Sequence, residues 1–210
     1  MQFRVLLIGA GGHARVCLEA LADDPDHLVI GAVSRDGTGV PDLLIPMLGT
    51  DDDVGALMGA HSLRHAHVAI GDNVARAGSA ARWVGAGGEL RACVSRFAMP
   101  SRSAAIGPGV ALLPGAVVNA ATTIGTGAIV NTNASIDHDC EIGDFAHIAP
   151  GAAIAGNVGV GPRTLVGIGS RVLPGLRIGA DVVVGAGAVV TADVPDGAVV
   201  VGIPARVRRP

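Results

Sequence analysis

The feature that most constrains this chain is an aliphatic residue at every sixth position through its second half. Fifteen successive positions of this series are Ile, Leu or Val: Ile106, Leu112, Val118, Ile124, Val130, Ile136, Ile142, Ile148, Ile154, Val160, Val166, Val172, Ile178, Val184 and Val190. The fourth residue after many of them is small, as at Ala116, Ala134 and Ala152. One large and one small inward residue in a period of six are typical of a hexapeptide-repeat parallel β-helix.

This repeat predicts a three-sided prism. Three hexapeptides make one triangular coil of about 18 residues, so the run predicts roughly five coils and a stack roughly 24 Å long. The winding of such prisms is left-handed, an exception to the usual right-handed crossover. Because the run of repeats is uninterrupted, we expect no long loop to project from the prism.

The turns between strands are expected where the repeat places residues that tolerate left-handed backbone. The residue after each aliphatic is often Gly, as at Gly107 and Gly143, or Asn or Asp, as at Asn119. We therefore expect the tight corners at these positions. The Pro-Gly pairs at 108–109, 114–115, 150–151 and 174–175 fit type II turns.

The composition excludes several classes of function. Lysine is absent, which rules out a Schiff-base lysine and a Walker-A lysine. The net charge of −3 argues against a nucleic-acid partner, and the apolar runs are too short for a transmembrane helix. The N-terminal segment lacks the features of a signal peptide. Cys17, Cys93 and Cys140 form no CxxC pair, so we expect buried small side chains in a reducing cytoplasm.

The first half of the chain alternates strand and helix patterns. We expect strands at 5–8, 27–33 and 67–70, and helices at 13–22 and from 73 to about 85. Thr50–Asp53 resembles the capping box at the start of another helix. This alternation predicts a small Rossmann-like parallel sheet with flanking helices. The expected fold is therefore an α/β domain over residues 1–90, then an all-β left-handed β-helix over residues 91–210 with a short C-terminal tail.

A glycine-rich loop follows the first strand. Gly9, Gly11 and Ala14 have the spacing of a relaxed dinucleotide fingerprint, in which glycines let backbone amides approach a phosphate at a helix N-terminus. A tight strand-to-helix turn in any α/β domain is the alternative. Because the chain switches to hexapeptides after roughly 100 residues, a nucleotide or nucleotide-sugar fits this domain better than NAD.

The corners of the repeat are polar in one place, residues 131–147. His138 lies two positions after the inward Ile136, so it is expected at or near a corner, pointing outward between Asp137 and Asp139. A neutral imidazole flanked by carboxylates is a good general base near pH 7. The alternative for His138, as for His147, is a surface histidine on a solvated turn. Two histidines without a third ligand at metal spacing predict no metal.

Four motifs together resemble the PglD/NeuD group of bacterial sugar O/N-acyltransferases over nearly the whole chain. They are the hexapeptides, the opening Gly-Ala-Gly-Gly-His-Ala, the segment Asn131-Thr-x-x-x-Ile-x-His138-Asp, and Val201-Gly-Ile-Pro-Ala205. The resemblance implies a cytoplasmic homotrimer with active sites between adjacent β-helices. It further implies acetyl-CoA as co-substrate, a nucleotide-sugar as substrate, and no metal, nucleic-acid or membrane partner.

The resemblance also implies the catalytic residues. His138 matches the catalytic base, and Asp139 matches the acidic residue that orients it, with Asp137 as the alternative. Asn131 matches a polar residue of the acceptor pocket. Gly156 lies 18 residues after His138, one full coil along the same corner, and its amide matches the family's oxyanion donor.

The residues for the two substrates follow from the same resemblance. The expected coenzyme-binding residues are His147, Gly156, Gly167, Ile168, Pro204 and Ala205. The expected nucleotide-sugar residues are Gly11, Gly12, His13, Ser34, Arg35, Gly71, Asp72 and Asn73. The family often has two acidic residues where this chain has Ser34-Arg35, so UDP, GDP and dTDP all remain open. Arg206, Arg208 and Arg209 either meet the coenzyme phosphates or form a solvated basic tail.

The implied reaction is direct acetyl transfer. His138 accepts the proton of the attacking group, and a covalent acyl-enzyme is not expected because Cys140 occupies an inward position of its hexapeptide. We expect N-acetylation of a nucleotide-linked 4-amino-4,6-dideoxy-sugar. The alternatives are O-acetylation of sialic acid or a relative, and a non-catalytic, regulatory or zinc-dependent β-helix protein.

Overall fold

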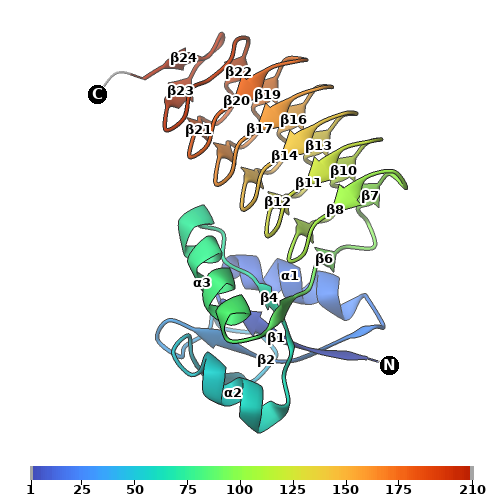
Figure 1. The fold of residues 1–210 in the computed structure, drawn as a ribbon, viewed down its shortest axis with the longest axis vertical. Helices are drawn as coiled ribbons and strands as arrows, with labels where there is room; N and C mark the ends of the chain where they lie inside the picture. The colour runs from blue at the N-terminus through green and yellow to red at the C-terminus, as the bar shows by residue number, and fades with distance from the viewer. Residues whose placement is uncertain (1, 209–210) are drawn as a thin grey trace.

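The computed structural model describes residues 2–208, and they form an α/β domain followed by a prism of stacked coils (Figure 1). The α/β domain holds five parallel strands in the order β3-β2-β1-β4-β5. Its elements are β1 (Phe3–Ile8), α1 (Gly12–Ala22), β2 (His27–Ser34), β3 (Met47–Thr50), α2 (Val54–His61), β4 (His65–Val68), α3 (Asn73–Gly85) and β5 (Glu89–Leu90). The expected parallel sheet with flanking helices is confirmed.

The alternation of buried side chains along β1 separates the two faces of this sheet. Leu7 packs with α1, whereas Leu6 and Ile8 pack with apolar residues of α2 and α3, among them Trp83. Both faces of the central strand are therefore covered, which explains its apolar run from Val5 to Ile8.

Three local expectations differ from the structure. β4 begins at His65 and ends at Val68, two residues before the expected strand, and the short strands β3 and β5 were not expected. Thr50 and Asp53 form only half of a capping box. The Asp53 carboxylate accepts from the Thr50 N–H at 2.7 Å, but α2 begins at Val54 and has no side-chain cap. The carboxylate bonds back to the end of β3 instead.

Two-residue strands six positions apart build the prism. They are β6 (Cys93–Val94), β7 (Met99–Pro100), β8 (Ala105–Ile106), β9 (Ala111–Leu112), β10 (Val117–Val118), β11 (Thr123–Ile124), β12 (Ile129–Val130), β13 (Ser135–Ile136), β14 (Glu141–Ile142), β15 (His147–Ile148), β16 (Ala153–Ile154), β17 (Gly159–Val160), β18 (Leu165–Val166), β19 (Arg171–Val172), β20 (Arg177–Ile178), β21 (Val183–Val184) and β22 (Val189–Val190). Every third strand is paired in parallel, as Val118 with Ile136, so one coil is 18 residues.

We call the three flat sides face 1, face 2 and face 3. Face 1 holds β6, β9, β12, β15, β18 and β21, and is extended by β23 (Val199–Val201) and the antiparallel β24 (Arg206–Val207). Face 2 runs from β7 to β22 and face 3 from β8 to β20. The turns that follow the strands of each face are called edge 1, edge 2 and edge 3.

The aliphatic series fills the prism as predicted. All of its members from Leu112 to Val190 are buried, and only Ile106, in the first coil, is half-buried. The prism begins earlier than the series, at β6, because Val94 and Pro100 take the aliphatic positions of the end coil and remain exposed. The stack is uninterrupted through β22, so the expected absence of a projecting loop holds for this part of the chain.

The turn geometry corrects one expectation. From Ile106 to Val184 the left-handed residue is the third after each aliphatic, not the first, as at Asn133 (φ 55°) and Asp139 (φ 58°). Glycine occupies the first position for a different reason, the close approach of the next coil. A Cβ on Gly143 would lie 2.5 Å from the backbone nitrogen of Pro162. The Pro-Gly pairs do place their glycines in left-handed backbone, with φ of 67–75°.

The α/β domain is docked onto face 1 and edge 3 of the prism. Ala14 and Cys17 of α1 pack with Ala111 and Ile129 of face 1. The sheet of the α/β domain ends at Leu90, and the first prism strand starts at Cys93. Within residues 2–208 no helix is both long enough and apolar enough to cross a bilayer.

Candidate active site

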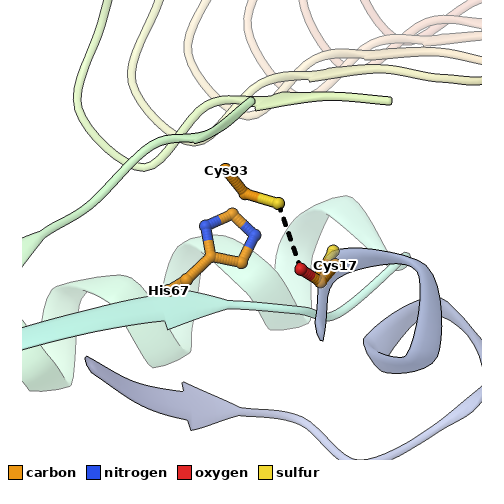
Figure 2. Close-up of side chains that lie close together, drawn as sticks. All are labelled: Cys17, His67 and Cys93. Atoms are coloured by element: carbon orange, nitrogen blue, oxygen red, sulfur yellow. Dashed lines mark hydrogen bonds between the residues drawn. The ribbon is translucent and has the colours of Figure 1, made fainter. Parts of the chain in front are cut away.

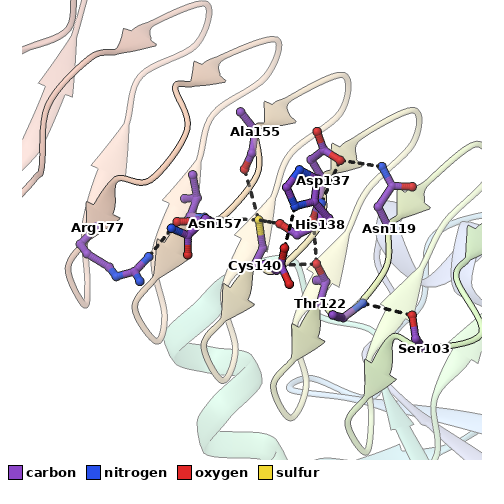
Figure 3. Close-up of polar contacts among 12 residues, drawn as sticks. Ser103, Asn119, Thr122, Asp137, His138, Cys140, Ala155, Asn157 and Arg177 are labelled. Atoms are coloured by element: carbon purple, nitrogen blue, oxygen red, sulfur yellow. Dashed lines mark hydrogen bonds and ion pairs between the residues drawn. The ribbon is translucent and has the colours of Figure 1, made fainter.

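His138 lies on edge 2, in the turn that follows β13, and points away from the prism axis (Figure 3). Its side chain is 60% exposed. The ring Nδ1 lies 2.7 Å from Oδ2 of Asp139, the residue in left-handed backbone. This hydrogen bond, followed by the charge of Asp137, raises the pKa of His138. The partner on Nδ1 leaves Nε2 free to accept a proton.

Asp137 has a different task from Asp139. Its Oδ1 accepts from the His138 backbone N–H at 2.8 Å and from the Asn119 side chain, one coil earlier, at 3.0 Å. These two donors lower the pKa of the Asp137 carboxyl. Asp137 therefore fixes the turn, whereas Asp139 is the carboxylate that contacts the imidazole ring.

Gly156 faces the other side of the His138 ring. A Cβ on Gly156 would lie 2.7 Å from both Cε1 and Nε2 of His138, so only glycine fits beside the ring in this position. No residue in 2–208 accepts a hydrogen bond from the Gly156 N–H. The turn thus presents a backbone donor next to the free ring nitrogen.

Cys140, the nearest thiol in the sequence to His138, points into the prism as expected. Its side chain is fully buried, and its Sγ donates to the Ala155 carbonyl at 3.2 Å. Burial raises the pKa of this thiol. The arrangement is poorly suited to nucleophilic attack, because the thiolate is the reactive form.

Asn131 and His147 lie together at a different corner. Asn131 opens edge 1 directly after β12, and its Nδ2 lies 3.0 Å from Nε2 of His147 in the neighbouring strand β15. Burial, followed by the electrostatic influence of the neighbouring Arg76 and His13, lowers the pKa of His147 to about 4. His147 is therefore neutral near pH 7 and faces the α/β domain.

The other expected coenzyme residues continue along edge 1. Gly167 and Ile168 lie in the turn after β18, with Ile168 exposed. Ala205 follows β23 and donates its N–H to the Val189 carbonyl, so the terminal Pro204–Ala205 turn lies at the upper end of the same edge. Arg206 and Arg208 are exposed beyond it, and Arg209 lies outside the described residues.

A cavity of about 890 Å³ opens at the carboxyl ends of β1, β2 and β4. Its lining includes the expected residues Gly11, Gly12, His13, Ser34, Arg35 and Gly71. Gly11 and Gly12 have open space around them, and the first turn of α1 leaves its amides without intrahelical acceptors. Carboxyl ends of parallel strands at a change in strand order form the usual crevice for ligands in such folds.

Asp72 and Asn73 have other contacts. Asp72 caps α3 by accepting from the Ala75 N–H at 2.8 Å. Asn73 donates to the Arg163 carbonyl of edge 3 at 2.8 Å and accepts from Arg76. Neither residue is among those lining the cavity. Asp72 therefore stabilises the start of α3, and Asn73 holds α3 against the prism.

Arg76 was not expected from the sequence. It is buried on α3 and donates to the carbonyls of Gly127 and Phe145 on edge 3, each at 2.7 Å. Burial lowers its pKa to about 10, so it stays charged near pH 7. In sequence it is one of fifteen arginines, and nothing local shows that it crosses to residues 51 and 69 positions away.

The comparisons with known proteins agree with this geometry. The family model of the PglD N-terminal domain matches residues 4–82. A variant of perosamine N-acetyltransferase from Caulobacter crescentus, in complex with CoA and GDP-perosamine, is 39% identical with a TM-score of 0.94, covering 99% of this chain and 97% of that one. The chain belongs to the PglD/NeuD-like family of sugar acetyltransferases.

Two further structures resemble this acetyltransferase over its full length. The acetyltransferase domain of PglB from Neisseria gonorrhoeae, in complex with acetyl coenzyme A, is 33% identical, with a TM-score of 0.90 and coverage of 99% and 100%. WeeI from Acinetobacter baumannii is 26% identical, with a TM-score of 0.86 and the same coverage. Comparison with curated protein sequences returned no match. The chain is therefore an acyltransferase enzyme with a left-handed β-helix.

The candidate residues of the acetyltransferase fall on two separate edges of one chain. His138, Asp139 and Gly156 lie on edge 2, whereas Asn131, Gly167 and Ile168 lie on edge 1. The whole width of face 2 lies between them, because β13 connects the two edges. One chain therefore does not bring its His138 to its own His147 and cavity.

Proposed function

We propose that this protein is an acetyl-CoA-dependent N-acetyltransferase that acts on a nucleotide-linked 4-amino-sugar. The observation that carries the proposal is the His138–Asp139 pair on edge 2, with the ring packed against Gly156, whose N–H has no acceptor among residues 2–208. A base and an oxyanion donor on adjacent coils are the two groups that acyl transfer from a thioester requires.

The reaction is a direct transfer. The neutral sugar amine attacks the thioester carbon of acetyl-CoA, and Nε2 of His138 accepts the proton that the amine loses. The Gly156 N–H stabilises the tetrahedral oxyanion, a contribution of about 3 kcal/mol in other acyl-transfer sites. Collapse of the intermediate breaks the C–S bond, and the imidazolium returns its proton to the CoA thiolate. Asp139 stabilises the imidazolium through Nδ1.

The cavity of the α/β domain fits the nucleotide part of the acceptor. The amides at the start of α1, beside Gly11 and Gly12, suit a diphosphate at a helix N-terminus. The 39%-identical perosamine N-acetyltransferase was solved with GDP-perosamine and CoA, which supports a nucleotide-linked amino sugar here. An amine also needs less activation than an alcohol, so a single histidine base suffices.

The separation of the two edges supports a homotrimer. If three prisms pack about a threefold axis, edge 2 of one protomer faces edge 1 of the next, as a heterologous interface requires. His138 of one protomer then meets Asn131 and His147 of its neighbour. Exposed apolar residues on both edges, Ile168 and Leu173, agree with a covered groove.

The test is thiol release from acetyl-CoA across UDP-, GDP- and dTDP-linked 4-amino-sugars, with light scattering of the same sample. We expect turnover with at least one nucleotide-linked amine, inhibition by the matching nucleoside diphosphate, and a trimer mass. Efficient acetylation of free sialic acid without inhibition by any of the three nucleotides would overturn the nucleotide-sugar assignment. A fully active monomer would overturn the assignment of the site to two protomers.

A further inference from the structure

Three sulfur and nitrogen ligands converge where the α/β domain meets the prism (Figure 2). Cys17 comes from α1, His67 from β4 and Cys93 from the first prism strand β6. All three side chains are buried, and their two Sγ atoms and one imidazole nitrogen lie within 4.8 Å of one another. The three residues are far apart in sequence and none belongs to the site on the prism edges.

Among residues 2–208, one nitrogen of the His67 imidazole has a hydrogen-bond partner and the other has none. Its Nδ1 lies 2.9 Å from the Arg91 carbonyl, and a carbonyl can only accept, so Nδ1 carries the proton. Nε2 is then a lone-pair acceptor. It is buried and has no hydrogen-bond partner among the described residues. Buried polar atoms without partners are rare, and each calls for a physical explanation.

A fourth donor stands beside the cluster. Nε2 of His13, one turn before Cys17 on α1, lies 3.5 Å from Cys17 Sγ. In a tetrahedral zinc site, with Zn–S of about 2.3 Å and Zn–N of about 2.0–2.1 Å, sulfur and nitrogen ligands lie roughly 3.5 Å apart. The His13–Cys17 pair has this separation, and the ligand atoms of Cys17, His67 and Cys93 lie within 4.8 Å of one another.

We propose that Cys17, His67 and Cys93 bind a zinc ion, with His13 as the fourth ligand. Two thiolates and two neutral imidazoles are a common zinc ligand set, and no carboxylate is among them, which disfavours magnesium and calcium. Binding releases the two thiol protons. The resulting site has no net charge, so its burial carries little electrostatic cost. The Arg91 carbonyl holds the His67 ring as partners behind zinc-bound histidines commonly do.

The position of the proposed zinc site indicates a structural role. It links α1 and β4 of the α/β domain to β6 of the prism, and His13 is also part of the cavity lining. The ion would therefore fix the domain junction and the start of α1 at the same time. The inference rests on these contacts alone and does not depend on the proposed acetyltransferase activity.

The test is anaerobic titration of the full-length, reduced protein with cobalt(II), a spectroscopic substitute for zinc. We expect one equivalent per chain, near-ultraviolet absorption from sulfur-to-cobalt charge transfer, and loss of the signal when zinc is added. Cys17→Ala and Cys93→Ala should each weaken binding at least tenfold. Cys140→Ala, which also removes a buried thiol but lies inside the prism, is the matched control and should bind like the parent.

A second measurement covers variants that fold poorly. Zinc at about 100 times its Kd should raise the Tm of the parent and of Cys140→Ala by roughly 5–10 °C, and should leave Cys93→Ala unchanged. Substoichiometric cobalt without charge-transfer absorption would overturn the proposal. So would equal loss of binding in Cys140→Ala and Cys17→Ala, or a Cys17–Cys93 disulfide in the protein isolated without oxidant.

Discussion

The prism and the α/β domain carry different kinds of functional residue. In the prism every coil repeats the same core, with Ile136 and Ile154 in equivalent positions on successive coils, so side chains on the edges vary without disturbing it. In the α/β domain each core residue has its own environment, and one large side chain, Trp83, has no counterpart. Functional side chains on the prism can therefore be recognised as departures from the repeat. In the α/β domain no repeat distinguishes them from other residues.

The largest expected effect is a loss of catalysis from a substitution on the prism. His138→Ala should lower kcat by about 10²–10⁴-fold, because the base acts mainly in the transition state, and should leave the Kd of CoA nearly unchanged. Activity assays measure kcat, and titration with CoA measures the Kd. His61→Ala, on α2 away from edges and cavity, is the control. Retention of more than a third of the activity by His138→Ala would assign the base elsewhere.

A substitution in the α/β domain should instead affect the binding of a substrate. Gly11→Ala adds a Cβ at the start of α1, in open space beside the cavity, so it should fold normally and crowd a bound phosphate. We expect the KM for the nucleotide-sugar to rise roughly tenfold, about 1.4 kcal/mol, while the KM for acetyl-CoA stays constant. Gly59→Ala, on the exposed surface of α2, is the control. An increase in the KM for both substrates would show that the α/β domain does not act on the nucleotide-sugar alone.

His147 tests the boundary between the two regions, because it belongs to face 1 but faces the α/β domain. His147→Ala removes the hydrogen bond with Asn131 and should raise the KM for acetyl-CoA about 3–10-fold, with a smaller effect on the nucleotide-sugar. Initial rates with each substrate varied in turn decide this. Unchanged CoA affinity would show that His147 serves the domain junction rather than the coenzyme.

The smallest effect concerns pH. Asp139 raises the pKa of His138, so its carboxylate stabilises the protonated ring. In Asp139→Asn the pKa of His138 should fall, and the acidic limb of kcat/KM should move to lower pH. The loss in kcat should be less than that of His138→Ala. Asp137→Asn, which removes the turn contacts instead, should shift the limb less.

Much of the prism could be predicted because its fold depends on a short repeat in the sequence. The period of six placed Ile136 inward and His138 outward, and the 18-residue coil placed Gly156 next to His138. The reason for the glycines was misassigned, since a sequence does not show that the next coil approaches Gly143 within a Cβ contact. The strand pairs that decide such contacts are 18 residues apart.

The junction could not be predicted, because it depends on contacts between distant segments. Arg76 reaches Phe145 across 69 residues, and Asn73 reaches Arg163 across 90 residues. Arg76 was therefore not expected from the sequence, and Asn73 was assigned to the nucleotide-sugar site. The same holds for Cys17, His67 and Cys93, which share no motif spacing. Side chains that cross between two folding units have no periodic pattern to reveal them.

The 18-residue register limits how proteins with this architecture change in length. One residue inserted within the repeat, and not extruded as a loop, would exchange inward and outward side chains in every later coil. Six such residues would move each later residue to another face. Only whole coils keep Asn131 and Gly167, two coils apart, on the same edge. The distance from the nucleotide cavity to the C-terminal turn therefore changes during evolution in steps of one coil, roughly 4.8 Å each.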